Sequence, residues 1–123
     1  MKTIGLIGGM SWESTVSYYQ AINRLVNSQL GGLHSAKICL YSVDFAEIEV
    51  FQRSGEWDKA ADALKRAAQS LEDAGADFLL ICTNTMHKVA AQVASAVAIP
   101  LLHIADATGV PLCENKVKKV GLL

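Results

Sequence analysis

A cysteine followed by small polar residues stands at the end of a short apolar run and is the strongest candidate for chemistry in the sequence. The run is Phe78–Ile81, and Cys82 is followed by Thr83, Asn84 and Thr85. A continuous apolar run of this length is typical of a strand that is buried on both faces of a parallel sheet. We therefore expect Cys82 at the C-terminal end of a strand, where open α/β sheets bind their ligands.

The chain after Cys82 has the spacing of a helix, with apolar residues at Met86, Val89, Ala90, Val93 and Val97. Thr83, Asn84 or Thr85 would serve as its N-cap. Such an N-terminus favours a thiolate at Cys82, with a pKa below the usual value of about 8.5. Its free N–H groups suit a carboxylate or a phosphate. The position fits equally well the alternative that Cys82 is a small core residue.

Strand-like and helix-like segments alternate along the rest of the chain. Strands are predicted over Thr3–Ile7, Ile38–Val43, Phe78–Ile81 and Leu101–Ile104. Gly8-Gly9-Met10-Ser11 is the turn after the first strand, and Ser11 is the expected N-cap of a long helix. Residues 44–52 form a short helix or an ordered loop. The pattern predicts an α/β fold with a parallel sheet of about four strands, flanked by helices through right-handed crossovers.

Two helices are predicted with defined apolar faces. The first has its apolar face at Val16, Tyr19, Ile22, Val26 and Leu30. The second is opened by Asp58 and has its apolar face at Ala61, Leu64, Ala67, Ala68 and Leu71. Gly75 stands where a glycine commonly ends a helix.

Composition excludes several classes of function. The chain has 123 residues, a formal charge of −1 and interspersed charges, which argues against nucleic acid and anionic membranes as partners. No apolar stretch reaches the length of a membrane span. The cysteines and histidines lack the spacing of disulfide frameworks or metal sites. We expect a cytoplasmic protein with reduced thiols.

Two further features of the sequence could form sites. Gly5-Leu6-Ile7-Gly8-Gly9 lacks the G-x-G-x-x-G spacing of dinucleotide-binding turns. His87 follows the Cys82 segment and His103 lies in the fourth predicted strand, so either could face the site. Isolated histidines are more often structural, and both readings stay open at this point.

The last residues repeat the first strand. Lys118-Lys119-Val120-Gly121-Leu122-Leu123 matches Lys2-Thr3-Ile4-Gly5-Leu6-Ile7 position by position in character. We therefore expect an N-terminal α/β domain over residues 1–115, with residues 116–123 as the first strand of a second, pseudo-symmetric domain.

These motifs together resemble the cofactor-independent aspartate/glutamate racemase family, most closely its broad-specificity amino-acid racemases. The resemblance covers the whole chain. It rests on Gly-Gly-Met-Ser-Trp-Glu-Ser-Thr (residues 8–15), Ser-Val-Asp-Phe (42–45), Gly-Glu-Trp-Asp-Lys (55–59), Cys-Thr-Asn-Thr-Met-His (82–87) and His-Ile-Ala-Asp-Ala-Thr (103–108).

The resemblance implies two similar domains with the active site between them and one catalytic cysteine from each. One thiolate removes the Cα proton of a small amino acid, and the opposite thiol protonates the other face, without a cofactor or a metal. Cys82 corresponds to the first cysteine. Asn84 and Thr85, with Thr83 nearby, would hold the α-carboxylate and stabilise the charge that develops on it. Ser11 and the Met10 backbone would line the other side, and a homodimer is compatible with this reading.

The sequence departs from the family pattern in two places. The second cysteine of the family lies in a Gly-Cys-Thr-Glu type motif, and this chain has no such motif. Cys113 is followed by Glu114-Asn115 instead. The chain as given is therefore expected to be inactive on its own. The segment after the second strand, residues 44–49, lacks the arginine of aspartate-specific members, which favours broader specificity. Two alternatives stay open: an isomerase or decarboxylase of the same superfamily, and a non-catalytic domain that binds a small anion.

Overall fold

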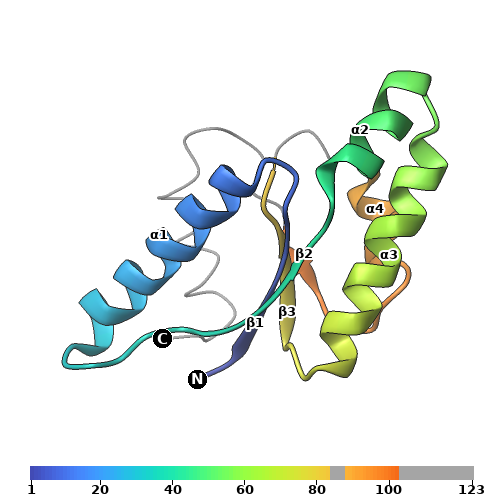
Figure 1. Ribbon diagram of the computed structural model, residues 1–123. Helices are drawn as coiled ribbons and strands as arrows, with labels where there is room; N and C mark the ends of the chain where they lie inside the picture. Colours follow the sequence, from blue (N-terminus) through green and yellow to red (C-terminus); the bar gives the residue numbers. More distant parts are fainter. Residues whose placement is uncertain (84–87, 103–123) are drawn as a thin grey trace.

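The computed structural model describes residues 1–83 and 88–102, and within this part strands alternate with helices as predicted (Figure 1). The strands are β1 (Thr3–Gly8), β2 (Lys37–Ser42), β3 (Phe78–Ile81) and β4 (Leu101–Leu102). The helices are α1 (Trp12–Leu30), α2 (Phe45–Ser54), α3 (Trp57–Asp73) and α4 (Ala90–Ala94). The segment 44–52, left open between helix and loop, is mostly helical.

The sheet has four parallel strands in the order β2-β1-β3-β4, which confirms the predicted fold class. Ile7 in β1 is in register with Tyr41 of β2 on one side and with Ile81 of β3 on the other. The two central strands carry the continuous apolar runs because they are covered on both faces. β2 lies at an edge and is largely exposed.

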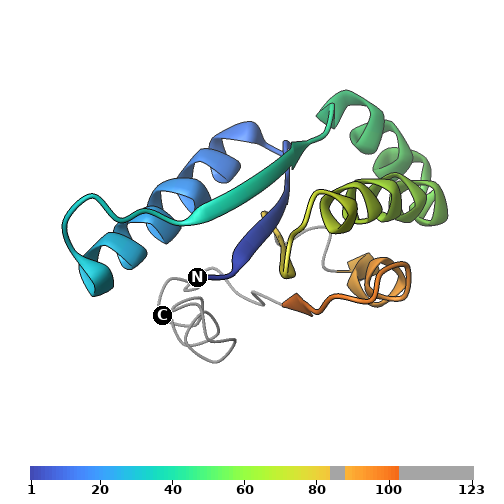
Figure 2. The same cartoon turned by 90° about the horizontal axis from the view of Figure 1, so that it is seen from below.

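Helices cover both faces of the sheet, with α1 on one side and α3 and α4 on the other (Figure 2). Each face has its own hydrophobic cluster. Ile4, Leu6, Phe78 and Leu80 belong to the cluster on the α1 side. Ile7, Leu79 and Ile81 belong to the cluster on the α3 side. This division follows from the alternation of side chains along a strand.

The α3 prediction is confirmed, since all of its predicted apolar positions are buried: Ala61, Leu64, Ala67, Ala68 and Leu71. Gly75 has a φ of +100° and follows the helix, as expected of a terminating glycine. The main-chain N–H groups of Gly75 and Ala76 donate to Glu72 and Leu71 carbonyls near the end of the helix.

The α1 prediction is only partly right. Ile22 and Val26 are buried as expected, but Val16, Tyr19 and Leu30 are exposed, and Thr15 is buried in their place. The apolar side chains of α1 therefore span a wider arc than the part of the helix that contacts the sheet, because a helix packs on a sheet along one side only.

Several predictions fall partly or wholly outside the described residues. The fourth strand is described only at Leu101–Leu102, so its predicted end at Ile104 lies outside. The boundary between residues 115 and 116 lies outside as well. Among the described helices, none combines the length and the apolar character that crossing a bilayer requires.

Candidate active site

The C-terminal ends of β1 and β3 lie side by side and bring two predicted site segments together. The pairing of Ile7 with Ile81 is continued by a hydrogen bond of 2.9 Å from the Cys82 N–H to the Ile7 carbonyl. Cys82 therefore directly follows β3, next to the point where the chain enters the Gly8–Ser11 turn. Sequence reasoning placed both segments at this edge, and the structure agrees for the described residues.

The Gly8–Ser11 turn is held tightly against the end of β2. The Val43 N–H donates to the Gly8 carbonyl at 2.8 Å. Gly9 has a φ of +91°, and a Cβ there would lie 2.4 Å from the Val43 carbonyl oxygen and 2.6 Å from the Val43 nitrogen. Only glycine fits such a close approach of two backbones without displacing one of them.

Thr15 fixes the same turn from the other side. Its Oγ1 accepts a hydrogen bond of 2.9 Å from the Gly9 N–H, and the side chain is buried. A Cβ on Gly8 would lie 2.6 Å from both Thr15 Oγ1 and Thr15 Cγ2, so this glycine is also required sterically. The sequence analysis did not single out Thr15. The feature of the sequence that could have indicated this role is its place four residues after the predicted N-cap, on the side of the helix that faces the glycine turn.

Ser11 is the only non-glycine residue with a positive φ among the described residues. Its φ is 69° and its ψ is 93°, a conformation that serine rarely adopts. It occupies the N-cap position as predicted, and its carbonyl accepts from the Ser14 and Thr15 N–H groups. Its exposed hydroxyl makes no capping hydrogen bond, so the side chain does not cap the N-terminus of the helix. Met10 beside it is buried in the cluster on the α3 side.

Cys82 lies with its side chain fully buried on the α1 side of the sheet. It belongs to the same cluster as Leu6, Ile22 and Leu80, while Thr83 is half-buried. Cys39 in β2 is partly buried against the opposite cluster. The burial of the Cys82 side chain fits both a core cysteine and a catalytic thiol that is shielded from bulk water.

In the described part of the chain, the helix expected after Cys82 is α4. α4 covers only Ala90–Ala94, and Val89 is its N-cap. The predicted caps Asn84 and Thr85 lie outside the described residues, as do His87 and His103. The effect of a helix N-terminus on Cys82 therefore has no support in the described part of the chain.

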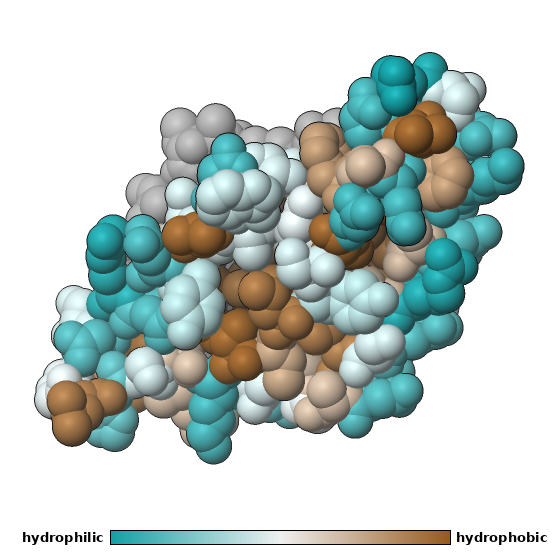
Figure 3. Space-filling model, viewed as in Figure 1, coloured by the Kyte–Doolittle hydropathy of each residue, from teal (hydrophilic) through white to brown (hydrophobic). Residues whose placement is uncertain are grey.

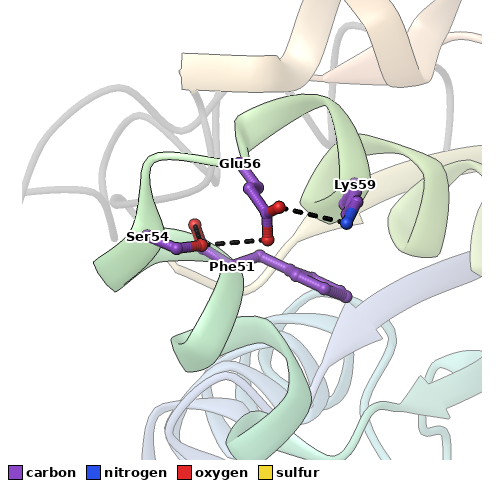
Figure 4. Close-up of polar contacts among 4 residues, drawn as sticks. All are labelled: Phe51, Ser54, Glu56 and Lys59. Carbon is purple, nitrogen blue, oxygen red and sulfur yellow. Dashed lines mark hydrogen bonds and ion pairs between the residues drawn. The ribbon is translucent and has the colours of Figure 1, made fainter.

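A small group of hydrogen-bonded polar side chains lies at the turn between α2 and α3 (Figure 4). Glu56 accepts hydrogen bonds from Lys59 Nζ at 3.0 Å and from Ser54 Oγ at 3.0 Å, and these bonds lower the pKa of its carboxyl group. Lys88 lies 4.3 Å from the centre of the Trp57 ring. This contact ties the chain that follows the Cys82 segment to the start of α3. The described residues contain no cluster of His, Cys, Asp or Glu suited to a metal ion.

Comparisons with known proteins agree with this geometry. Residues 7–123 match the family model described as Asp/Glu/Hydantoin racemase. A Yersinia pestis protein, whose assignment as an Asp/Glu racemase is provisional, is 60% identical, with a TM-score of 0.85. An aspartate racemase homologue from Pyrococcus horikoshii is 32% identical, with a TM-score of 0.79. Each match covers 98% of this chain and 50% of the other.

A third solved structure shares the fold at lower identity. The aspartate racemase of Picrophilus torridus is 21% identical, with a TM-score of 0.67 over 100% of this chain and 78% of its own. This chain thus spans about half the length of the first two relatives. With its parallel sheet, its glycine turn and a family match over nearly its whole length, the chain belongs to the Asp/Glu/Hydantoin racemase family.

Proposed function

We propose that this chain forms one side of the active site of an amino-acid racemase that works without pyridoxal phosphate or a metal. Membership of the racemase family supports the reaction class. The observation that carries the proposal is the position of Cys82, which directly follows β3 and is bonded through its N–H to Ile7, beside the glycine turn. Ligands of parallel α/β sheets bind at this edge.

In the proposed reaction Cys82 Sγ is one of two groups that exchange a proton with Cα. A thiolate on one face takes the Cα proton, and the electron pair left behind is delocalised into the α-carboxylate. A thiol on the other face then gives its proton to Cα, so one thiol is lost and one is gained. Asn84 and Thr85, with Thr83 nearby, would hold the α-carboxylate and stabilise the intermediate charge, and Ser11 and the Met10 backbone would line the other side of the site.

We propose that the second thiol of this scheme comes from a domain that corresponds to the half of the relatives' length that this chain does not span. A single thiol reaches only one face of Cα, and displacement of a catalytic group by an ångström costs on the order of 100-fold in rate. We therefore propose that the 123-residue chain alone is inactive. The substrate is a small amino acid, and the chain has no arginine within residues 44–49 to favour an acidic side chain.

The test uses a chain of the relatives' length that contains this sequence. In deuterium oxide it should incorporate deuterium at Cα while inverting the amino acid. Cys82→Ser should lower the rate by at least about 100-fold, since proton transfer by a positioned group contributes that much or more. Cys39→Ser is the matched control, because Cys39 lies in the middle of β2 and not at the edge where the site is expected.

A second function is favoured by one observation, the full burial of Cys82 in an apolar cluster. In that alternative Cys82 is a core residue of a non-catalytic domain that binds a small anion. Cys82→Ser would then destabilise the fold, and no amino acid would exchange its Cα proton. Racemase activity that survives Cys82→Ser, or that depends on added pyridoxal phosphate, would refute the proposed mechanism.

A further inference from the structure

Thr15 has an unusual place among the buried side chains. It is 5% exposed, and apart from the Cys82 thiol it is the only polar or charged side chain that is buried in the described part of the chain. The other two buried residues of α1, Ile22 and Val26, are apolar. Burial of a hydroxyl costs free energy unless the group is hydrogen-bonded, so a valine would be the simpler choice here. A threonine at this place is therefore accounted for by the contacts of its hydroxyl.

Thr15 contacts three of the four residues of the Gly8–Ser11 turn. Its Oγ1 accepts the hydrogen bond from the Gly9 N–H, and its main-chain N–H donates to the Ser11 carbonyl at 3.4 Å. Its two branches, Oγ1 and Cγ2, lie at the same distance of 2.6 Å from the place that a Cβ on Gly8 would occupy. A β-branched side chain has few rotamers in a helix, so the packing of Cγ2 beside Gly8 keeps the hydroxyl directed at Gly9.

The hydrogen bond between Gly9 and Thr15 is shielded from bulk water. Both residues are buried, and Leu40 Cδ1 of β2 lies 3.2 Å from the place of a Cβ on Gly8. Apolar side chains also gather over β2 between α1 and α3 in Figure 3. Water is therefore poorly placed to replace the hydroxyl, and a side chain without one would leave the buried Gly9 N–H unsatisfied.

The position of Ser11 depends on these contacts. Its φ of 69° is unfavourable for a residue with a side chain, and its own hydroxyl makes no capping hydrogen bond. Such a conformation persists only where neighbouring groups determine it. Thr15 holds the turn on both sides of Met10, through the Gly9 N–H before it and the Ser11 carbonyl after it. Loss of the bond to Gly9 would let Met10 and Ser11 shift together.

We propose that Thr15 is a positioning residue of the racemase site, an inference that rests on the proposed function. It is buried behind the turn and acts through Ser11 and the Met10 backbone, which would line the site opposite the Cys82 segment. Proton transfer at Cα requires alignment of the substrate, and a displacement of about an ångström costs on the order of 100-fold in rate. Thr15 therefore affects the rate of the reaction without contacting the substrate.

The first experiment measures kcat and KM of variants in a chain of the relatives' length that contains this sequence. Thr15→Val should lower kcat by at least about tenfold and change KM by less than about threefold, because alignment matters most in the transition state. Thr15→Ser keeps the hydroxyl and should retain kcat to within about threefold. Gly55→Ala is the control for loss of stability alone, because its φ is +75° and it lies between α2 and α3, outside the proposed site. It should lower the midpoint of urea unfolding and leave kcat unchanged.

The second experiment follows the turn without requiring activity. In the same protein, labelled with carbon and nitrogen isotopes, the Cα and Cβ chemical shifts of Ser11 depend on its φ and ψ. They should change in Thr15→Val and stay the same in Gly55→Ala, and far-UV circular dichroism shows whether each variant is folded.

Three results would overturn the proposal: unchanged Ser11 shifts in Thr15→Val, a kcat that falls no further than in Gly55→Ala, or a Thr15→Ser variant as slow as Thr15→Val. A parent protein that racemises no amino acid, while its Ser11 shifts respond to Thr15→Val, would refute the proposed function and support the placement of Ser11 by Thr15.

Discussion

Replacing Gly9 by alanine tests whether the turn at the candidate site is set by steric contact with the backbone of β2. A Cβ at Gly9 would meet the Val43 carbonyl oxygen at 2.4 Å and the Val43 nitrogen at 2.6 Å. These are backbone atoms of the segment that follows an edge strand, and they cannot rotate away as a side chain would. Gly55 provides the matched comparison, because its φ is +75° and a Cβ there would meet nothing within 4 Å.

The expected free energies differ for a physical reason. A left-handed backbone costs an alanine about 1–2 kcal/mol at either position. The loss of chain entropy in the unfolded state, which favours alanine by about 0.4–1 kcal/mol, is also common to both. The overpacking against Val43 adds about 1–3 kcal/mol at Gly9 alone. Gly9→Ala should therefore destabilise the protein by that much more than Gly55→Ala does.

Urea unfolding followed by circular dichroism measures this difference from the shift of the midpoint at a constant slope. A domain of this size has a stability of about 5–15 kcal/mol, so both variants should remain folded enough to compare. Equal destabilisation by the two substitutions would show that the contact with Val43 does not constrain the turn. A larger effect at Gly55 would refute the reasoning altogether.

Two further outcomes follow from individual hydrogen bonds. Thr15→Val keeps the side-chain shape but leaves the buried Gly9 N–H without its 2.9 Å acceptor, so it should lower the free energy of unfolding by about 1–3 kcal/mol. Thr15→Ser keeps the hydroxyl and should cost less, and the reverse order would contradict this role. The pKa of Glu56 is lowered below 4.5, first by its hydrogen bond from Lys59 and then by that from Ser54. Its stabilising contribution is therefore fully present above pH 4.5 and lost as the pH falls through the lowered pKa. The midpoint of urea unfolding should fall less with acidification in Glu56→Gln, and an unchanged pH dependence would count against the interaction.

The sequence allowed the fold class to be predicted because its signals were local. The continuous apolar run Phe78–Ile81 indicates a strand buried on both faces, and the spacing of apolar residues in α3 indicates a helix buried on one face. Both segments are buried as expected. Gly75 also ends its helix as predicted, because an L-side chain is strained at its φ of +100°. In these segments local propensity and tertiary packing favour the same structure.

The predictions that failed depended on tertiary placement. The apolar residues of α1 are spread over more than one face, and only the position of the helix on the sheet decides that Ile22 is buried and Tyr19 exposed. The role of Thr15 arises from its approach to Gly8 and Gly9, which no periodicity reveals. At the candidate site the sequence placed Cys82 and the glycine turn at the same edge of the sheet. It did not predict the bounds of α4, which are Ala90–Ala94.

The turn at the candidate site is anchored in helix α1 and in the segment after β2. The turn is fixed by Val43 on one side and by Thr15 on the other, and Thr15 is itself part of the first turns of α1. Ser11, in its strained conformation, directly precedes Trp12, the first residue of α1. Strain of this kind persists only where the surrounding structure holds it in place. The contacts of Val43 and Thr15 with the turn therefore hold Ser11 in place, which is the preorganisation that the proposed proton transfer at Cα requires.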